Sequence, residues 1–102
     1  MVTVIRMVLS AVSESDVEEL INGFRADVVP AFEAVPGCLG IELVRADKPG
    51  VGGLVEGGVI TRWASAEAME AGLQDPEVIA SQARVRALLR REPLRKVYEV
   101  IG

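Results

Sequence analysis

Residues 54–82 organise the chain: they begin Leu54-Val-Glu-Gly-Gly-Val-Ile-Thr-Arg-Trp63, pass through Ala64-Ser65, and continue into a segment that carries Met69 and Gln82. The first ten of these residues are rich in β-branched and apolar side chains, which predicts a strand. The following residues predict a helix from Ser65 to Leu73 and a second helical stretch from Asp75, because Ser65 and Asp75 are good N-caps. The only tryptophan therefore lies where a strand gives way to a helix.

Three more strands and one more helix are predicted around this segment. The strands cover residues 2–11, 38–46 and 94–101, where the apolar runs are too short for helices. The helix starts after the candidate caps Ser13 and Ser15, and we expect Pro30 to kink its last turn. Its apolar stripe consists of Val17, Leu20, Ile21, Phe24, Val28 and Phe32. The order strand, helix, strand, strand, helix, strand predicts an α+β, ferredoxin-like domain with a mostly antiparallel sheet and two helices on one face.

Alternation along the strands predicts which side chains the helices cover. We expect the covered side of the sheet to carry Met7, Leu43, Val59, Thr61, Trp63 and Tyr98. We expect the open side to carry Val4, Arg6, Val8, Glu42, Val44, Ile60, Arg62, Val97, Glu99 and Ile101. Because such an open side is too apolar to leave in water, the sequence predicts a homodimer packed sheet to sheet.

Size and composition exclude several classes of function. The 102 residues suit one domain, residues 1–102. The absence of histidine removes the commonest metal ligand and general base, and a single cysteine, Cys38, permits no internal disulfide. No apolar run approaches the ~20 residues of a membrane helix and no leader is recognisable, so we expect a soluble cytoplasmic protein without a membrane partner.

The charge distribution argues against a nucleic-acid partner, because the net charge is −4. Six basic residues nevertheless gather in the last third of the chain, and we interpret them as a solvated helix face: Arg84, Arg86, Arg90, Arg91, Arg95 and Lys96. The glycines of residues 47–53 predict a hairpin connection rather than a phosphate-binding loop, because no helix follows them. Gly57 and Gly58 indicate a bulge or a close approach of two backbones.

Two polar side chains fall on the apolar stripe of the second helical region. Gln82 and Arg86 are one turn apart and share the arc of Val78, Ile79, Val85 and Leu89. In one interpretation Gln82 bonds a nearby backbone group and Arg86 reaches solvent. In the other, both point into a small-molecule pocket between helix and sheet. The two interpretations stand equal, whereas for Trp63 alone core packing is the favoured role.

Several motifs resemble the antibiotic biosynthesis monooxygenase family across nearly the whole chain. They are Val35-Pro-Gly-Cys-Leu-Gly-Ile-Glu-Leu43, Arg62-Trp63-Ala-Ser65-Ala-Glu-Ala-Met69 and Leu73-Gln-Asp-Pro76. The resemblance implies a dimeric α/β barrel of ferredoxin-like protomers. Trp63 matches the tryptophan that ends the family's third strand and lines its pocket.

The chain departs from both characterised branches of that family. In the haem-degrading branch, an Asn, a Trp and a haem-ligating His correspond to Met7, Gly72 and Gln82, so haem degradation is not expected. In the quinone-forming polyketide oxygenases, the pocket Asn, two Tyr and Arg correspond to Val59, Leu43, Met69 and Gln82. Only Trp63 is kept.

The resemblance implies a cofactor-independent monooxygenase that acts on an apolar, aromatic or polyketide-type small molecule of secondary metabolism. An electron-rich substrate anion would reduce dioxygen, so neither a cofactor nor a metal is expected. The candidate catalytic residues are Trp63 and Gln82, and the candidate substrate-binding residues are Met7, Leu43, Val59, Thr61, Met69, Arg86 and Tyr98. The alternative is a non-oxidative cyclase or isomerase, or a ligand-binding protein, that uses the same pocket.

Overall fold

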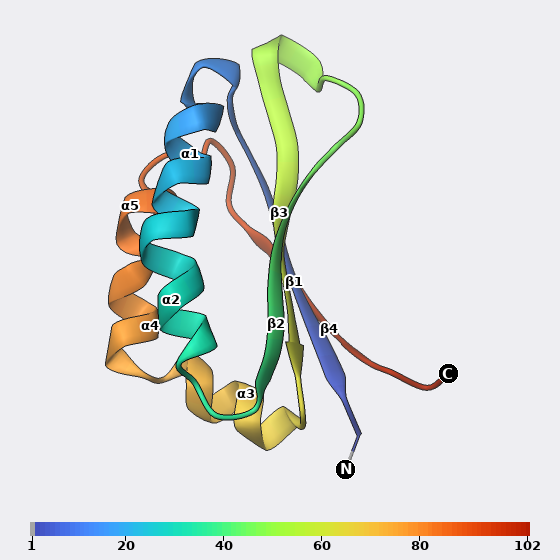
Figure 1. The fold of residues 1–102 in the computed structure, drawn as a ribbon. Helices are drawn as coiled ribbons and strands as arrows, with labels where there is room; N and C mark the ends of the chain where they lie inside the picture. The colour runs from blue at the N-terminus through green and yellow to red at the C-terminus, as the bar shows by residue number, and fades with distance from the viewer. Residues whose placement is uncertain (1) are drawn as a thin grey trace.

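The helices cover one face of a four-stranded antiparallel sheet in the computed structural model, which describes residues 2–102 (Figure 1). The sheet order is β2-β3-β1-β4. The strands are β1 (Val4–Ser13), β2 (Cys38–Arg45), β3 (Leu54–Trp63) and β4 (Leu94–Glu99). The predicted ferredoxin-like α+β fold is confirmed, and β3 has the predicted bounds.

The first helical segment changes its winding along its length. It runs through η1 (Glu14–Asp16), α1 (Val17–Gly23), η2 (Phe24–Val28) and α2 (Val29–Glu33), of which η2 is a π-helical turn. Pro30, in the first turn of α2, has no backbone N–H to donate, so the hydrogen-bond ladder of an ordinary α-helix is interrupted there. The wider π turn lies directly before it. The predicted irregularity therefore exists, but it lies on the N-terminal side of Pro30.

The second helical segment has the predicted interruption before Pro76 and a further one, which was not predicted, at Gln82. It consists of α3 (Ala66–Leu73), α4 (Pro76–Ser81) and α5 (Ala83–Arg86). The Ser65 hydroxyl accepts a hydrogen bond from the Ala68 N–H at 3.1 Å, and the Asp75 carboxylate accepts one from the Glu77 N–H at 2.8 Å. Both predicted caps are confirmed.

The caps predicted for the first helix form no capping hydrogen bond. Ser13 does occupy the N-cap position of η1, but its hydroxyl accepts a hydrogen bond from Arg90 Nη1 at 2.6 Å instead. Ser15 lies inside η1 rather than at the start of a helix.

The β1 side chains face the opposite way from the prediction. Val4, Arg6 and Val8 lie opposite Trp63, Thr61 and Val59 of β3, and directly paired residues of neighbouring strands point to the same side of a sheet. Trp63 and Thr61 are buried under the helices, so these three β1 residues face the helices as well. The prediction was wrong because both rows of β1 are mostly apolar, so alternation alone does not show which row the helices cover.

The same register corrects the predictions for β4 and for the other row of β1. Met7 pairs with Ile60, and Tyr98 pairs with Ile5, so Met7 and Tyr98 lie on the open face instead of the covered one. Val97 and Glu99 pair with Arg6 and Val4, which places them on the covered side. The predictions for Glu42, Val44, Ile60 and Arg62 agree with the register, which pairs them in β2 and β3 on the open face.

Trp63 is the centre of the core. It is fully buried and lies 6.2 Å from Phe32, ring centroid to ring centroid, with the two planes tilted by 59°. The other members of this core cluster are Val4, Phe24, Val28, Val35, Met69 and Val78. Within residues 2–102, no helix is both long enough and apolar enough to cross a membrane.

The glycines of the hairpin and of β3 have separate roles. Gly52 and Gly53, in η3 (Val51–Gly53), adopt positive φ angles, which side chains resist, and they complete the predicted connection between β2 and β3. A Cβ atom at Gly57 or Gly58 would collide with a carbonyl oxygen of a neighbouring strand, so the predicted close approach is confirmed. The register irregularity lies elsewhere, in β2 between Cys38 and Gly40.

Candidate functional site

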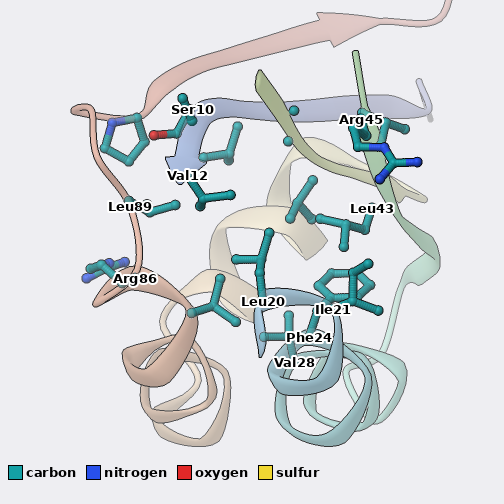
Figure 2. Close-up of a pocket in the computed structure, with 18 of the residues that line it drawn as sticks. Ser10, Val12, Leu20, Ile21, Phe24, Val28, Leu43, Arg45, Arg86 and Leu89 are labelled. Atoms are coloured by element: carbon teal, nitrogen blue, oxygen red, sulfur yellow. The ribbon is translucent and has the colours of Figure 1, made fainter. Parts of the chain in front are cut away.

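A cavity of about 470 Å³ separates the first helical segment from the sheet (Figure 2). Its volume falls within the range of about 300–1,000 Å³ that is usual for small-molecule sites. One wall is formed by Leu20, Ile21, Phe24 and Val28. The sheet contributes Val8, Val12, Leu43 and Val59, and the end of the second helical segment contributes Gln82, Val85, Arg86 and Leu89. Most of the enclosing side chains are therefore apolar.

Local structure explains why the cavity stays open. The π turn η2 supplies Phe24 and Val28 to its wall, and π turns displace side chains from ordinary α-helical positions. On the sheet side, Gly57 lies opposite Ser10 in the row that faces the helices. Since Gly57 has no side chain, nothing projects into the cavity from that position.

Gln82 is held by its own helix and also lines the cavity. Its Nε2 donates a hydrogen bond to the Val78 carbonyl oxygen at 3.2 Å, so the interpretation of local satisfaction is confirmed for this residue. The amide oxygen takes no part in that bond, and it can accept a hydrogen bond from a ligand. Arg86 is exposed at one side of the cavity, as Figure 2 shows.

Four of the nine predicted site residues line the cavity, namely Leu43, Val59, Gln82 and Arg86. Trp63, Thr61 and Met69 lie in the core instead, and the Trp63 indole N–H donates a hydrogen bond to the Thr61 hydroxyl at 2.8 Å. The predicted placement of these three in the same pocket as Gln82 is wrong. Met7 and Tyr98 lie on the opposite face of the sheet, so their predicted placement is wrong too.

Sequence reasoning missed Arg6 and the helical wall of the cavity. Leu20, Ile21, Phe24 and Val28 were predicted to be buried, but a stripe pattern does not distinguish a packed core from the wall of a cavity. Arg6 did carry a signal, because it is a lone charge in the middle of an otherwise apolar strand. Ile79 was assigned to the buried stripe, yet it is 56% exposed.

The six basic residues do not form one solvated helix face. Arg86 and Arg95 line the cavity, and Lys96 lies opposite Met7 on the open sheet face. Arg90 donates a hydrogen bond to the Ser13 hydroxyl. Arg91 forms an ion pair with Glu56 at 2.9 Å, and Arg84 lies 3.8 Å from Asp27. That prediction was wrong because four of the six residues lie beyond the end of α5.

Titratable groups around the cavity are almost all cationic. Burial lowers the pKa of Arg6, and the positive charges of Arg95 and Arg86 lower it further.

The chain's one thiol is also affected by burial, which raises the pKa of Cys38, so this group stays protonated at neutral pH. Within residues 2–102, no three His, Cys, Asp or Glu side chains are grouped so that they could hold a metal ion.

The fold and the cavity together define a small α+β domain with an apolar site between its helices and its sheet. The sequence of residues 1–84 matches the antibiotic biosynthesis monooxygenase family, and the chain belongs to that family. No curated protein matches the sequence.

Solved structures share this fold at low sequence identity. A protein from Caulobacter crescentus CB15, assigned to the same family, is 17% identical with a TM-score of 0.81, and the match covers 99% of this chain and 92% of that one. A variant of SnoaB, a cofactor-independent oxygenase from Streptomyces nogalater, is 18% identical with a TM-score of 0.71, over 98% and 94% of the two chains. A conserved protein of unknown function from Bacteroides thetaiotaomicron VPI-5482, described as a possible oxidoreductase, is 14% identical with a TM-score of 0.76, over 97% and 98%.

Proposed function

We propose that this protein is a cofactor-independent oxygenase of an apolar aromatic small molecule. The observation that carries the proposal is the cavity of about 470 Å³, whose mostly apolar walls also carry polar and charged side chains. Membership of the antibiotic biosynthesis monooxygenase family supports it, and so does the shared fold of SnoaB. An aromatic body would lie against Leu20, Phe24 and Leu43.

In this mechanism the chain holds the substrate, excludes water and stabilises negative charge. The substrate reacts as an electron-rich anion that transfers electrons to dioxygen inside the dry cavity. One oxygen atom becomes a carbonyl oxygen of the product, and the other leaves as water with the two hydrogens lost by the substrate. The amide oxygen of Gln82 accepts a hydrogen bond from a substrate hydroxyl, and Arg86 attracts the anion.

Dioxygen uptake with anthrone, an apolar tricyclic ketone that forms an enolate, tests the proposal. We expect uptake with formation of anthraquinone above the rate of the buffer alone. Leu43→Trp should fill the cavity and abolish the added rate, because Leu43 lines it. Leu39→Trp is the matched control, since Leu39 lies on the same strand but is 61% exposed and does not line the cavity. Uptake that survives Leu43→Trp would contradict the assignment of the cavity.

The second candidate is a protein that binds such molecules, or cyclises or isomerises them, without dioxygen. The observation in its favour is that the Trp63 N–H is already bonded to Thr61 and cannot serve an oxygenation site in the cavity. Binding of anthrone without dioxygen uptake would support this candidate.

We also propose that the protein forms a homodimer through the open face of the sheet. The register places six large apolar side chains on that face: Ile5, Met7, Leu9, Ile60, Leu94 and Tyr98. Leu94 and Tyr98 are 54% and 52% exposed. A contiguous apolar surface of this kind is typical of a protein interface.

A further inference from the structure

Arg6 occupies an unusual position for a cation. It lies in the middle of β1 on the side of the sheet that faces the helices, where its direct partners are Thr61 on β3 and Val97 on β4. The residue is only partly exposed, and it lines the cavity. A guanidinium at such a position loses part of its hydration, so an anionic partner is expected nearby.

Two further cations, Arg95 and Arg86, act on Arg6. Arg95 lies two residues before Val97 on the same side of β4, where it is opposite Val8. Arg86, at the end of α5, reaches the same cavity from the helical layer (Figure 2). Burial and the charges of Arg95 and Arg86 all lower the pKa of Arg6. Three cations thus converge from three different elements.

In the described part of the chain, no carboxylate forms an ion pair with Arg6, Arg86 or Arg95. Among residues 2–102, the ion pairs are Arg91 with Glu56 and Arg84 with Asp27, and neither includes a cation of the group. Glu56 lines the cavity too, but Arg91 lies 2.9 Å from it. Glu99 shares the covered side of β4 with Arg95, yet it forms no ion pair with Arg6.

The positive region continues outward from the cavity. A shallow adjoining hollow shares Arg86, Leu89, Pro93 and Arg95 with the cavity and adds Arg90, Arg91 and Glu92. Its far side is exposed, so an anion can approach from solvent along basic side chains. The opposite end of the cavity is lined by Leu43, Val44 and Arg45, well separated from Arg86 in Figure 2.

We propose that Arg6, Arg86 and Arg95 form a binding site for one oxyanion of the ligand, whose apolar body fills the cavity. The proposal rests on the proposed function insofar as the cavity must take a small aromatic molecule. It narrows the ligand to an aromatic anion, either a carboxylate or an ionised phenol or enol. Three donors of this kind offer more hydrogen bonds than one oxyanion needs, and guanidinium groups bind oxyanions in bidentate geometry.

The proposal also removes the need for a general base. A phenol or enol bound beside three cations ionises at a lower pH than it does in water, because the cations stabilise its charged form. The O–H bond breaks, its electron pair stays on oxygen, and the proton goes to solvent. The resulting anion is the electron-rich species that the oxygenation requires.

Calorimetric binding of 2-naphthoate and 2-naphthamide, which share a two-ring body but differ in charge, tests the proposal. We expect naphthoate to bind at least tenfold more tightly. Arg6→Gln and Arg95→Gln should each remove most of that preference and leave naphthamide binding unchanged. Arg45→Gln is the matched control, because Arg45 lines the far end of the cavity. If Arg6→Gln fails to fold, Arg95→Gln still tests the proposal, because Arg95 is exposed.

A second titration distinguishes the two kinds of oxyanion. Absorbance of bound 4-nitrophenol against pH reports its ionisation, and a midpoint below that of the free phenol assigns a phenolate site. An unchanged midpoint with preferential naphthoate binding assigns a carboxylate site. Equal affinity for naphthoate and naphthamide would overturn the oxyanion site while leaving the aromatic cavity in place. If neither naphthoate nor naphthamide binds, the cavity is not a site for aromatic molecules, and the proposed function is refuted as well.

Discussion

The hydrogen bond between Trp63 and Thr61 is a closed polar pair inside the core. Both residues are almost completely buried, and the indole N–H has the Thr61 hydroxyl as its partner at 2.8 Å. Thr61→Val keeps the side-chain shape but leaves the indole N–H unpaired, so we expect a loss of about 1–3 kcal/mol in the free energy of unfolding. Urea unfolding followed by far-UV circular dichroism measures it, because this signal does not depend on the only tryptophan, Trp63.

Two controls separate stability from binding in that experiment. Adding Trp63→Phe to Thr61→Val removes the orphaned donor, so the double variant should lose less than the sum of the two single changes. Because neither residue lines the cavity, Thr61→Val should leave naphthoate affinity unchanged. Weakened naphthoate binding by a folded Thr61→Val variant would show that Trp63 and Thr61 contribute to the ligand site after all.

Gly72 allows α3 to approach the tryptophan closely. A Cβ at this position would lie 2.7 Å from a ring carbon of Trp63 and 2.8 Å from Val35 Cγ1. Gly72→Ala therefore overpacks the core, and we expect a loss of about 1–3 kcal/mol in unfolding free energy. Gly40→Ala is the control, since a Cβ there meets nothing within 4 Å. Equal stability of the two variants in urea would argue against this packing.

Sequence predicted the identity of buried residues better than their surroundings. Trp63 was expected in the core and lies there, because burying a large aromatic side chain at the end of an apolar strand removes much apolar surface from water. Its exclusion from the cavity depends on how α3 crosses β3, which no spacing encodes. Arg6 was assigned to the open face from the alternation along the strand. Only the pairing with β3 shows that it faces the helices.

The caps of the second helical segment and the bounds of β3 were predictable at the scale of the element. Ser65 and Asp75 cap α3 and α4 as expected, since a side-chain oxygen before an apolar run satisfies the first free N–H groups of a helix. The facing of β1 was not predictable, because both of its rows are apolar enough to be buried. Alternation along β1 then shows only that its two rows of side chains point to opposite faces of the sheet. The pairing with β3 decides which row the helices cover.

The Asp75 cap positions the helical turn that carries Gln82 and leads to Arg86. Asp75→Ala removes the hydrogen bond to the Glu77 N–H, and we expect a loss of about 1 kcal/mol in the free energy of unfolding. Naphthoate affinity should also fall, because a frayed α4 no longer holds the end of α5 over the cavity. Ser15→Ala provides the control for thermal unfolding, since Ser15 is exposed and does not cap a helix.

At the scale of the whole molecule, helices cover only one face of the sheet (Figure 1). Met7 lies at the centre of the other face, opposite Ile60 and Lys96. Met7→Lys should place a second positive charge beside Lys96 in the proposed dimer interface, so we expect a shift from dimer to monomer in size-exclusion chromatography with light scattering. Ala80→Lys, on an exposed site of α4, should leave the dimer intact. A wild-type monomer at micromolar concentration would refute the dimer.

The position of β4 at the edge of the sheet makes ligand affinity depend on local opening of the strand. All six of its residues are exposed, and its only neighbour in the sheet is β1. Its amide hydrogens should therefore exchange with deuterated water faster than those of β3, which has a strand on each side. Because Arg95 contributes to the oxyanion site only while β4 is paired, bound naphthoate should slow that exchange by mass action. The rate at which the edge strand opens would then set an upper limit on how long an anion stays bound.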